Sequence, residues 1–216
     1  MTDVLEQLIR SPRLPEYLSE LQKLVSAEGE RRQRFYAEMT ESQKTEFING
    51  EVIVHSPAKL RHNAVVKNIL TVLDAYVRRS NLGYVGFEKL LVTLPRNDYE
   101  PDVCFFRREV ADGFTPDQVH FPAPDLVVEV LSPGTEPKDR GVKFEDYAAN
   151  GVQEYWLADP EREVIEQYLL HDGRYELRLK SDTGEVKCEA IAGLVVPVRA
   201  LFDSAANQAF VRQLLR

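Results

Sequence analysis

Two acidic residues stand at apolar positions in the middle of the chain. Asp102 follows Pro101 and opens the segment DVCFF, and Glu129 interrupts the apolar run 126–131. Both segments are typical of short buried strands. A carboxylate inside such a run is costly to bury unless it is paired or binds a metal. Two carboxylates on neighbouring strands would form a small cup for a divalent cation, which favours metal-assisted hydrolysis, above all of a phosphodiester.

Two aspartates that follow a proline, Asp102 and Asp125, are candidates for the partner of Glu129. Asp125 and Glu129 share a face of one strand, but at ~3.3 Å per residue they lie ~13 Å apart. One ion with oxygen ligands at ~2.0–2.6 Å cannot bridge that distance. We therefore predict that Asp102 is the partner and that Asp125 makes a turn hydrogen bond where its strand begins. From the residues alone, an ion pair between Glu129 and a buried arginine explains the acid equally well.

Helical and strand-like patterns surround these acids and must position them. Leucines recur at helical spacing over residues 14–24, so residues 1–40 are predicted to be a separate helical extension. Asn49-Gly50 between short apolar runs predicts a β-hairpin, and a wide apolar stripe over 59–79 predicts a long core-facing helix. Strands, a helix over 138–151 and further strands follow. This order predicts an α/β fold with a mixed sheet.

Composition and charge narrow the class of protein. The chain has 216 residues, of which 44% are hydrophobic and 29% charged, as expected for one compact domain with an appendage. We expect no membrane span, because the apolar runs are strand-sized. No secretory signal is visible, and Cys104 and Cys188 lack metal-ligand spacing, so a cytoplasmic location is expected. The net charge of −8 is unusual for a dedicated DNA binder, although an acidic metal site contributes to it.

Several motifs together resemble a known family. They are GEVIVHSP followed by RHN, then EPDV, PDLVVEVLSPGT and DRGVKFEDYAANGVQEYWLADP. This set resembles the Uma-two family of restriction-type endonucleases, within the PD-(D/E)XK nuclease superfamily. The resemblance runs roughly from Glu46 to Tyr168 and is densest over 124–160. It implies a restriction-endonuclease-like mixed β-sheet flanked by helices over residues 41–216. The helical extension 1–40 lies outside the resemblance.

The superfamily pattern is an aspartate after a proline, then an acid, any residue and a lysine on the next strand. Asp102 and Glu129 match the two acids, but Leu131 stands where the lysine belongs. The resemblance implies that the lysine has moved to the following helix, at Lys143. An ordinary ion pair with Asp139, four residues earlier in that segment, is the alternative role for Lys143.

Two further residues are weaker candidates for the same site. Glu51 follows the hairpin turn and could supply another metal carboxylate, or it could simply face solvent. His62 lies on the apolar stripe of the long helix, near its start. It could orient a phosphate or a water molecule through an imidazole N–H, or it could be a satisfied core histidine.

The leading prediction is a Mg²⁺- or Mn²⁺-dependent endodeoxyribonuclease acting on DNA. Asp102, Glu129 and the Val130 carbonyl would hold the ion, because a set of oxygen ligands favours these hard ions over zinc. Lys143 would stand near the attacking water. Cutting both strands of a duplex calls for two sites, which favours a homodimer. The alternative is a catalytically inactive nuclease-fold module that binds nucleic acid or protein. The missing in-strand lysine and the acidic charge favour that alternative.

Overall fold

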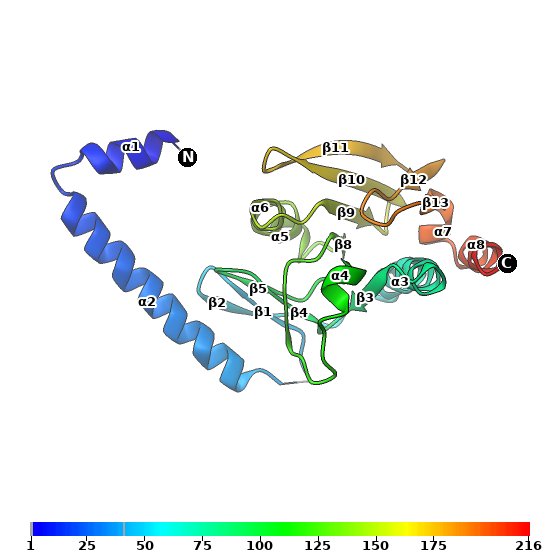
Figure 1. The fold of residues 1–216 in the computed structure, drawn as a ribbon, viewed down its shortest axis with the longest axis horizontal. Helices are drawn as coiled ribbons and strands as arrows, with labels where there is room; N and C mark the ends of the chain where they lie inside the picture. The colour runs from blue at the N-terminus through cyan, green and yellow to red at the C-terminus, as the bar shows by residue number, and fades with distance from the viewer. Residues whose placement is uncertain (1, 41) are drawn as a thin grey trace.

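The N-terminal segment forms a helical arm, as its leucine pattern predicts. The computed structural model describes residues 2–40 and 42–216, and the arm consists of α1 (Thr2–Arg10) and α2 (Leu14–Glu38). Figure 1 shows α2 leading away from the body, with α1 at its far end. The last turns of α2 are anchored: Phe35 is buried and stacks on Phe47 with ring centroids 5.8 Å apart. Arg32 Nε donates to Asp98 Oδ2 at 2.6 Å.

The central sheet is mixed and carries the segments that hold Asp102 and Glu129. Its strands, in spatial order, are β11 (Arg174–Ser181), β10 (Val164–His171), β9 (Glu154–Asp159), β8 (Leu126–Val130), β6 (Val103–Arg107) and β3 (Gly83–Phe87). Strands β8 and β9 run parallel, whereas the other neighbours are antiparallel. This sheet confirms the predicted α/β class with a mixed sheet.

A second sheet begins with the predicted hairpin. Its strands, in spatial order, are β2 (Glu51–Val54), β1 (Thr45–Ile48), β5 (Asp98–Tyr99), β4 (Leu91–Thr93) and β7 (His120–Phe121). At the turn, Asn49 and Gly50 both have positive φ, at 51° and 85°, as a two-residue hairpin with the right twist requires. A small antiparallel pair, β12 (Glu185–Lys187) and β13 (Val195–Pro197), completes the strands.

Helices cover both faces of the central sheet (Figure 1). The long helix α3 (Leu60–Ser80) buries its apolar stripe on one face, together with α7 (Val198–Phe202) and α8 (Ser204–Leu214). On the other face lie α5 (Glu136–Asp139) and α6 (Val142–Ala149), and α4 (Arg108–Ala111) follows β6 directly. None of the helices in residues 2–40 and 42–216 combines the length and apolarity needed to cross a membrane.

The alternation along β8 decides which way its acid points. Leu126, Val128 and Val130 belong to the core under α3, whereas Val127 and Leu131 belong to the core under α6. Because successive strand residues point to opposite faces, Glu129 lies on the α6 side. By the same period, Asp102 shares the α6-side face of Cys104 and Phe106 in β6. The two acids therefore lie on the same face of the sheet.

Candidate active site

Asp102 and Glu129 lie on neighbouring segments of the central sheet: Asp102 directly precedes β6, and Glu129 is in β8. In the antiparallel β6–β8 pair, Val103 lies opposite Val128, so the next position outward places Asp102 opposite Glu129. Both side chains are buried, with exposures of 5% and 3%. Asp102 Oδ2 accepts a hydrogen bond from the Val130 backbone N–H at 2.9 Å. The structure thus brings together the two acids that the strand patterns single out.

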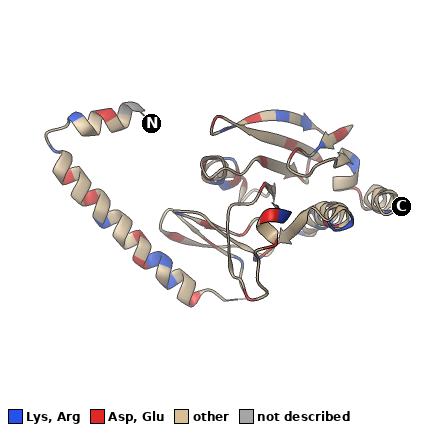
Figure 2. Ribbon diagram, in the orientation of Figure 1, with Lys and Arg blue, Asp and Glu red and all other residues tan. Residues whose placement is uncertain are grey.

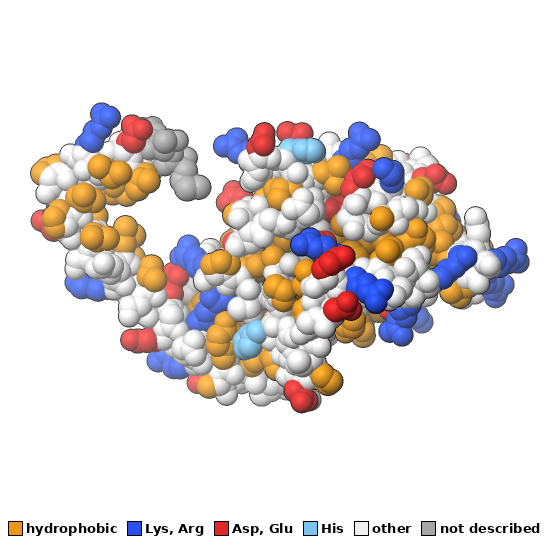
Figure 3. Space-filling model, viewed as in Figure 1, with side chains coloured by type: hydrophobic (Ala, Val, Ile, Leu, Met, Phe, Trp, Pro, Cys, Tyr) orange, Lys and Arg blue, Asp and Glu red, His pale blue; other side chains and the backbone are white. Residues whose placement is uncertain are grey.

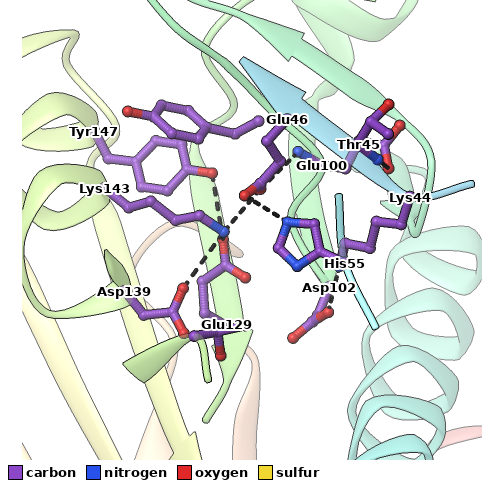
Figure 4. A network of polar contacts seen from close by, with 12 residues as sticks. Lys44, Thr45, Glu46, His55, Glu100, Asp102, Glu129, Asp139, Lys143 and Tyr147 are labelled. Atoms are coloured by element: carbon purple, nitrogen blue, oxygen red, sulfur yellow. Dashed lines mark hydrogen bonds and ion pairs between the residues drawn. The ribbon is translucent and has the colours of Figure 1, made fainter. Parts of the chain in front are cut away.

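Lys143, on α6, reaches the same acids. Its Nζ lies 3.1 Å from Glu129 Oε1, 2.8 Å from Glu46 Oε1 and 3.4 Å from Asp139 Oδ1. The side chain is only 2% exposed, so its ammonium points into the protein and not to solvent. Figure 4 shows the three carboxylates converging on this nitrogen from a strand of each sheet and from α5. The Tyr147 hydroxyl, also on α6, donates to Glu129 Oε1 at 3.4 Å.

Glu46 on β1 is a member of this cluster that the sequence reasoning missed. It is wholly buried; its Oε1 accepts from the Glu100 N–H at 3.1 Å, and its Oε2 lies 2.9 Å from His55 Nε2. Glu51, the hairpin residue that was a candidate metal ligand, is exposed at the start of the outer strand β2. The structure therefore does not bring Glu51 into the cluster. An acid within the strand-like run TEFI is the same signal that identified Glu129.

Basic side chains hold Asp102 from the other side. Lys44 Nζ lies 2.8 Å from Asp102 Oδ1, and His62 Nε2, near the start of α3, lies 3.2 Å from Oδ2. Burial acts to raise the pKa of Asp102, but Lys44 and His62 outweigh it and hold that pKa well below its usual range. For His62, burial acts to lower the pKa, and the bond to Asp102 outweighs it, so the pKa is raised. Asp125 is elsewhere, accepting from the Arg107 N–H at 2.7 Å.

The cluster around Lys143 contains more negative charge than this lysine can neutralise. Burial acts to raise the pKa of Glu46, but Lys143 and then His55 outweigh it and lower the pKa to about 2. For Glu129, burial dominates and the neighbouring carboxylates add to it, so its pKa is raised to about 8 despite Lys143. Asp139 is buried as well, and burial raises its pKa even though Lys143 Nζ lies 3.4 Å from its Oδ1. Another positive charge in the cluster would stabilise the ionised forms of these carboxyl groups.

The residue types fit a hard divalent ion, whereas their present contacts are to basic side chains. Carboxylate and carbonyl oxygens are the ligands that Mg²⁺ and Mn²⁺ prefer. The N–H and C=O of an extended residue point to the same side, so the Val130 carbonyl lies on the side of Asp102. Within residues 2–40 and 42–216, no three His, Cys, Asp or Glu side chains surround one ion-sized point. An ion bound to Asp102 must therefore displace Lys44, whose side chain is 22% exposed.

A mixed sheet between helices, with an acid pair on adjacent strands and a lysine beside it, is typical of restriction-endonuclease-like proteins. Residues 31–199 match the Uma2 family, described as "Putative restriction endonuclease". The chain belongs to this family. The match begins within α2, at the turns that pack on the second sheet, and includes every residue of the cluster.

The chain is also similar to two uncharacterized proteins and to a solved structure. One uncharacterized protein of Synechocystis sp. is 30% identical over 130 residues, which is 59% of this chain and 72% of the relative. Another from the same organism is 31% identical over 146 residues, 62% of this chain and 70% of the relative. A crystal structure described as a putative nuclease belonging to DUF820, from Anabaena variabilis, has the same fold: its TM-score is 0.67 at 20% identity, over 80% of this chain and 96% of that one.

Proposed function

We propose that this protein is a Mg²⁺- or Mn²⁺-dependent endodeoxyribonuclease that hydrolyses DNA phosphodiester bonds. The observation that carries the proposal is the buried pair of Glu129 in β8 and Asp102 at the start of the neighbouring β6, with the Lys143 ammonium 3.1 Å from Glu129 Oε1. Family membership supports it, because the family is described as one of restriction endonucleases. The surplus of buried carboxylates supports the requirement for a cation.

Asp102, Glu129 and the Val130 carbonyl are the proposed ligands of the ion. A divalent ion bound there supplies an acidified water and neutralises charge that develops on the phosphate. Lys143 has a raised pKa, since the three carboxylates outweigh the effect of burial. It therefore stays protonated, and its proposed role is to orient the attacking water as a positively charged hydrogen-bond donor.

Two residues have supporting roles in this proposal. Glu46 lies 2.8 Å from Lys143 Nζ and so fixes the position of the ammonium. His62 is 12% exposed at the edge of the cluster, and its bond to Asp102 favours the protonated ring. When the Asp102 carboxylate binds the metal ion instead of His62, the protonated ring can donate its N–H to a phosphate oxygen. Glu51 has no place in the proposed mechanism, because its side chain is exposed.

The test is cleavage of supercoiled plasmid with Mg²⁺ or Mn²⁺, and with chelator as a blank. Wild-type protein is expected to nick or linearise the plasmid only with an ion. Glu46 and Glu51, on the two strands of one hairpin, provide a matched pair of variants. Glu46→Gln is expected to reduce cleavage at least ten-fold, because it loosens Lys143, and Glu51→Gln is expected to leave it unchanged.

The same assay can contradict the proposal. If wild-type protein cleaves neither duplex nor single-stranded DNA with either ion, catalysis is absent. A gel-shift measurement on the same DNA then tests the alternative of a nuclease-fold binding module. That alternative has one structural observation in its favour: lysine and histidine side chains already occupy the carboxylates of the cluster.

A further inference from the structure

The helical arm exposes a row of large apolar side chains. Among its described residues, eight Val, Leu and Ile side chains are between 37% and 69% exposed: Val4, Leu5, Ile9, Leu14, Leu18, Leu21, Leu24 and Val25. Figure 3 shows hydrophobic side chains gathered along the arm, where it stands clear of the body. Scattered exposed leucines are ordinary, but contiguous apolar patches larger than a few hundred Å² mark interaction sites.

The exposed row continues the face by which α2 packs on the body. Leu21 and Phe35 are two heptads apart, as are Leu18 and Arg32, so each pair lies on nearly the same side of the helix. Phe35 and Arg32 are anchored on the second sheet through Phe47 and Asp98. The apolar face therefore extends beyond the sheet on a helix that is fixed at its C-terminal end. A fixed helix presents this face in a defined direction.

The spacing and the size of the row fit another copy of the same helix. Leu14, Leu18, Leu21 and Val25 alternate steps of four and three, which is the 3.5-residue repeat of a coiled-coil seam. At roughly 100 Å² for each exposed side chain, the arm presents on the order of 800 Å², the area that each partner of a standard interface buries. A seam of this kind is self-complementary, as a two-fold symmetric contact requires.

The charge of the arm disfavours a membrane or DNA as the occupant. Residues 3–30, the part of the arm that carries the exposed row, contain six acidic and three basic side chains, a net charge of −3. Of the arginines that follow, Arg31 and Arg32 are bound to the body, at Gly50 and Asp98. Figure 2 shows charges of both signs along α2, with basic residues grouped only near its C-terminal end, next to the body. Helices that bind anionic membranes carry Lys and Arg on their polar face, and DNA binding requires basic groups to neutralise phosphates.

We propose that α1 and the exposed half of α2 are a dimerisation surface that packs against the same helices of a second copy. This inference deepens the proposed function, on which it rests for its biological purpose, because cutting both strands of a duplex calls for two sites. The interface is distinct from the acid cluster, whose side chains lie on or beside the sheets and on α3, α5 and α6. Its loss should therefore separate subunits without altering either site.

Sedimentation velocity of the full chain between 1 and 100 µM tests the proposal. Wild-type protein is expected to sediment as a dimer, and Leu18→Glu/Leu21→Glu as a monomer with unchanged circular dichroism and melting temperature. Leu177→Glu on β11 is the matched control, since Leu177 is 54% exposed and Leu18 is 52% exposed. Val25→Glu is a second, milder variant that should weaken the dimer at least ten-fold if the double variant does not fold.

A monomeric wild-type chain, or glutamate variants that fold and remain dimeric, would overturn the proposal. Sedimentation of a monomeric chain with anionic vesicles would overturn it in favour of a membrane surface. Plasmid cleavage distinguishes this failure from failure of the proposed function. A wild-type dimer that does not cleave plasmid would contradict the proposed nuclease function but not the proposed interface. A wild-type monomer that cleaves plasmid would contradict only the proposed interface. With both correct, Leu18→Glu/Leu21→Glu should nick plasmid while its linear product falls several-fold.

Discussion

Replacing Glu129 with glutamine should make the metal-free protein more stable at neutral pH. Burial, reinforced by neighbouring carboxylates, raises the pKa of Glu129 from 4.5 to about 8. The folded protein must therefore keep a proton on a group that is ionised in the unfolded chain at pH 7. Glutamine has nearly the same size and no charge, and its amide oxygen can still accept from Lys143 and Tyr147.

The size of the effect follows from the two pKa values. A carboxyl with a higher pKa in the folded state binds its proton more tightly when folded, so stability falls as pH rises from about 4.5 to about 8. At ~1.4 kcal/mol per pH unit, the penalty at pH 7 amounts to about 3 kcal/mol. For a chain of this length, each kcal/mol shifts the melting temperature by ~2–4 °C. Glu129→Gln should therefore melt several degrees higher, up to about 10 °C.

Thermal unfolding of both proteins in chelator, at steps from pH 5 to pH 8, measures this effect. The difference between the two melting temperatures should be small at pH 5 and should grow towards pH 8. Glu51→Gln, an exposed acid-to-amide change, should follow wild type throughout. A Glu129→Gln protein that melts below wild type at pH 7 would contradict this prediction. It would mean that Glu129 is ionised in a stabilising pair with Lys143.

Four further predictions concern other parts of the molecule. Lys143→Met should lower the free energy of unfolding by ~3–5 kcal/mol at pH 8, because the buried carboxylates lose the cation that they share. The loss should be smaller at pH 5, where these carboxylates take up protons, and chemical denaturation measures both. Glu154→Ala should cost at least ~3 kcal/mol by the same measurement, because this carboxylate accepts from two buried side-chain N–H groups and two backbone N–H groups. Gly29→Ala should raise helix content by circular dichroism and stabilise α2 by up to ~1 kcal/mol, since a Cβ there meets nothing within 4 Å. Burial acts to raise the pKa of Glu166, but Arg140 and other donors outweigh it and lower the pKa to about 2. The wild-type carboxylate therefore stabilises the fold above pH 4.5 and loses this effect as the pH falls towards 2. Glu166→Gln should flatten the acid-unfolding curve between these pH values.

Local patterns in the sequence were sufficient for the elements around the site. The Asn49-Gly50 turn and the long helix, observed as α3, depend on neighbouring residues alone, and both are present as predicted. The pairing of Asp102 with Glu129 followed from the cost of burying acids inside apolar strands. The prediction that Lys143 belongs to the site came from the family resemblance, because nothing in the local sequence distinguishes it from a surface lysine that pairs with Asp139.

The choice between Glu46 and Glu51 could not be made from the hairpin sequence. Strand β1 is buried at all four positions, because it lies between β2 and β5, whereas β2 is an outer strand and is largely exposed. A central strand that is buried on both faces loses the alternation that would reveal its inward residues. Which strand of a hairpin becomes central depends on distant segments such as β5. The contacts of Lys44 and His55 are likewise set by packing between the two sheets.

The most direct test of the proposed metal site is a crystal of the protein soaked in Mn²⁺, with anomalous diffraction data. We expect one strong anomalous peak with oxygens of Asp102 and Glu129 and the Val130 carbonyl at ~2.0–2.6 Å, and Lys44 moved away from Asp102. Glu129→Gln crystals treated in the same way should lose the peak. A soaked crystal without a peak at these oxygens, with Lys44 and His62 still bound to Asp102, would contradict the claim that this cluster is a metal-dependent nuclease site.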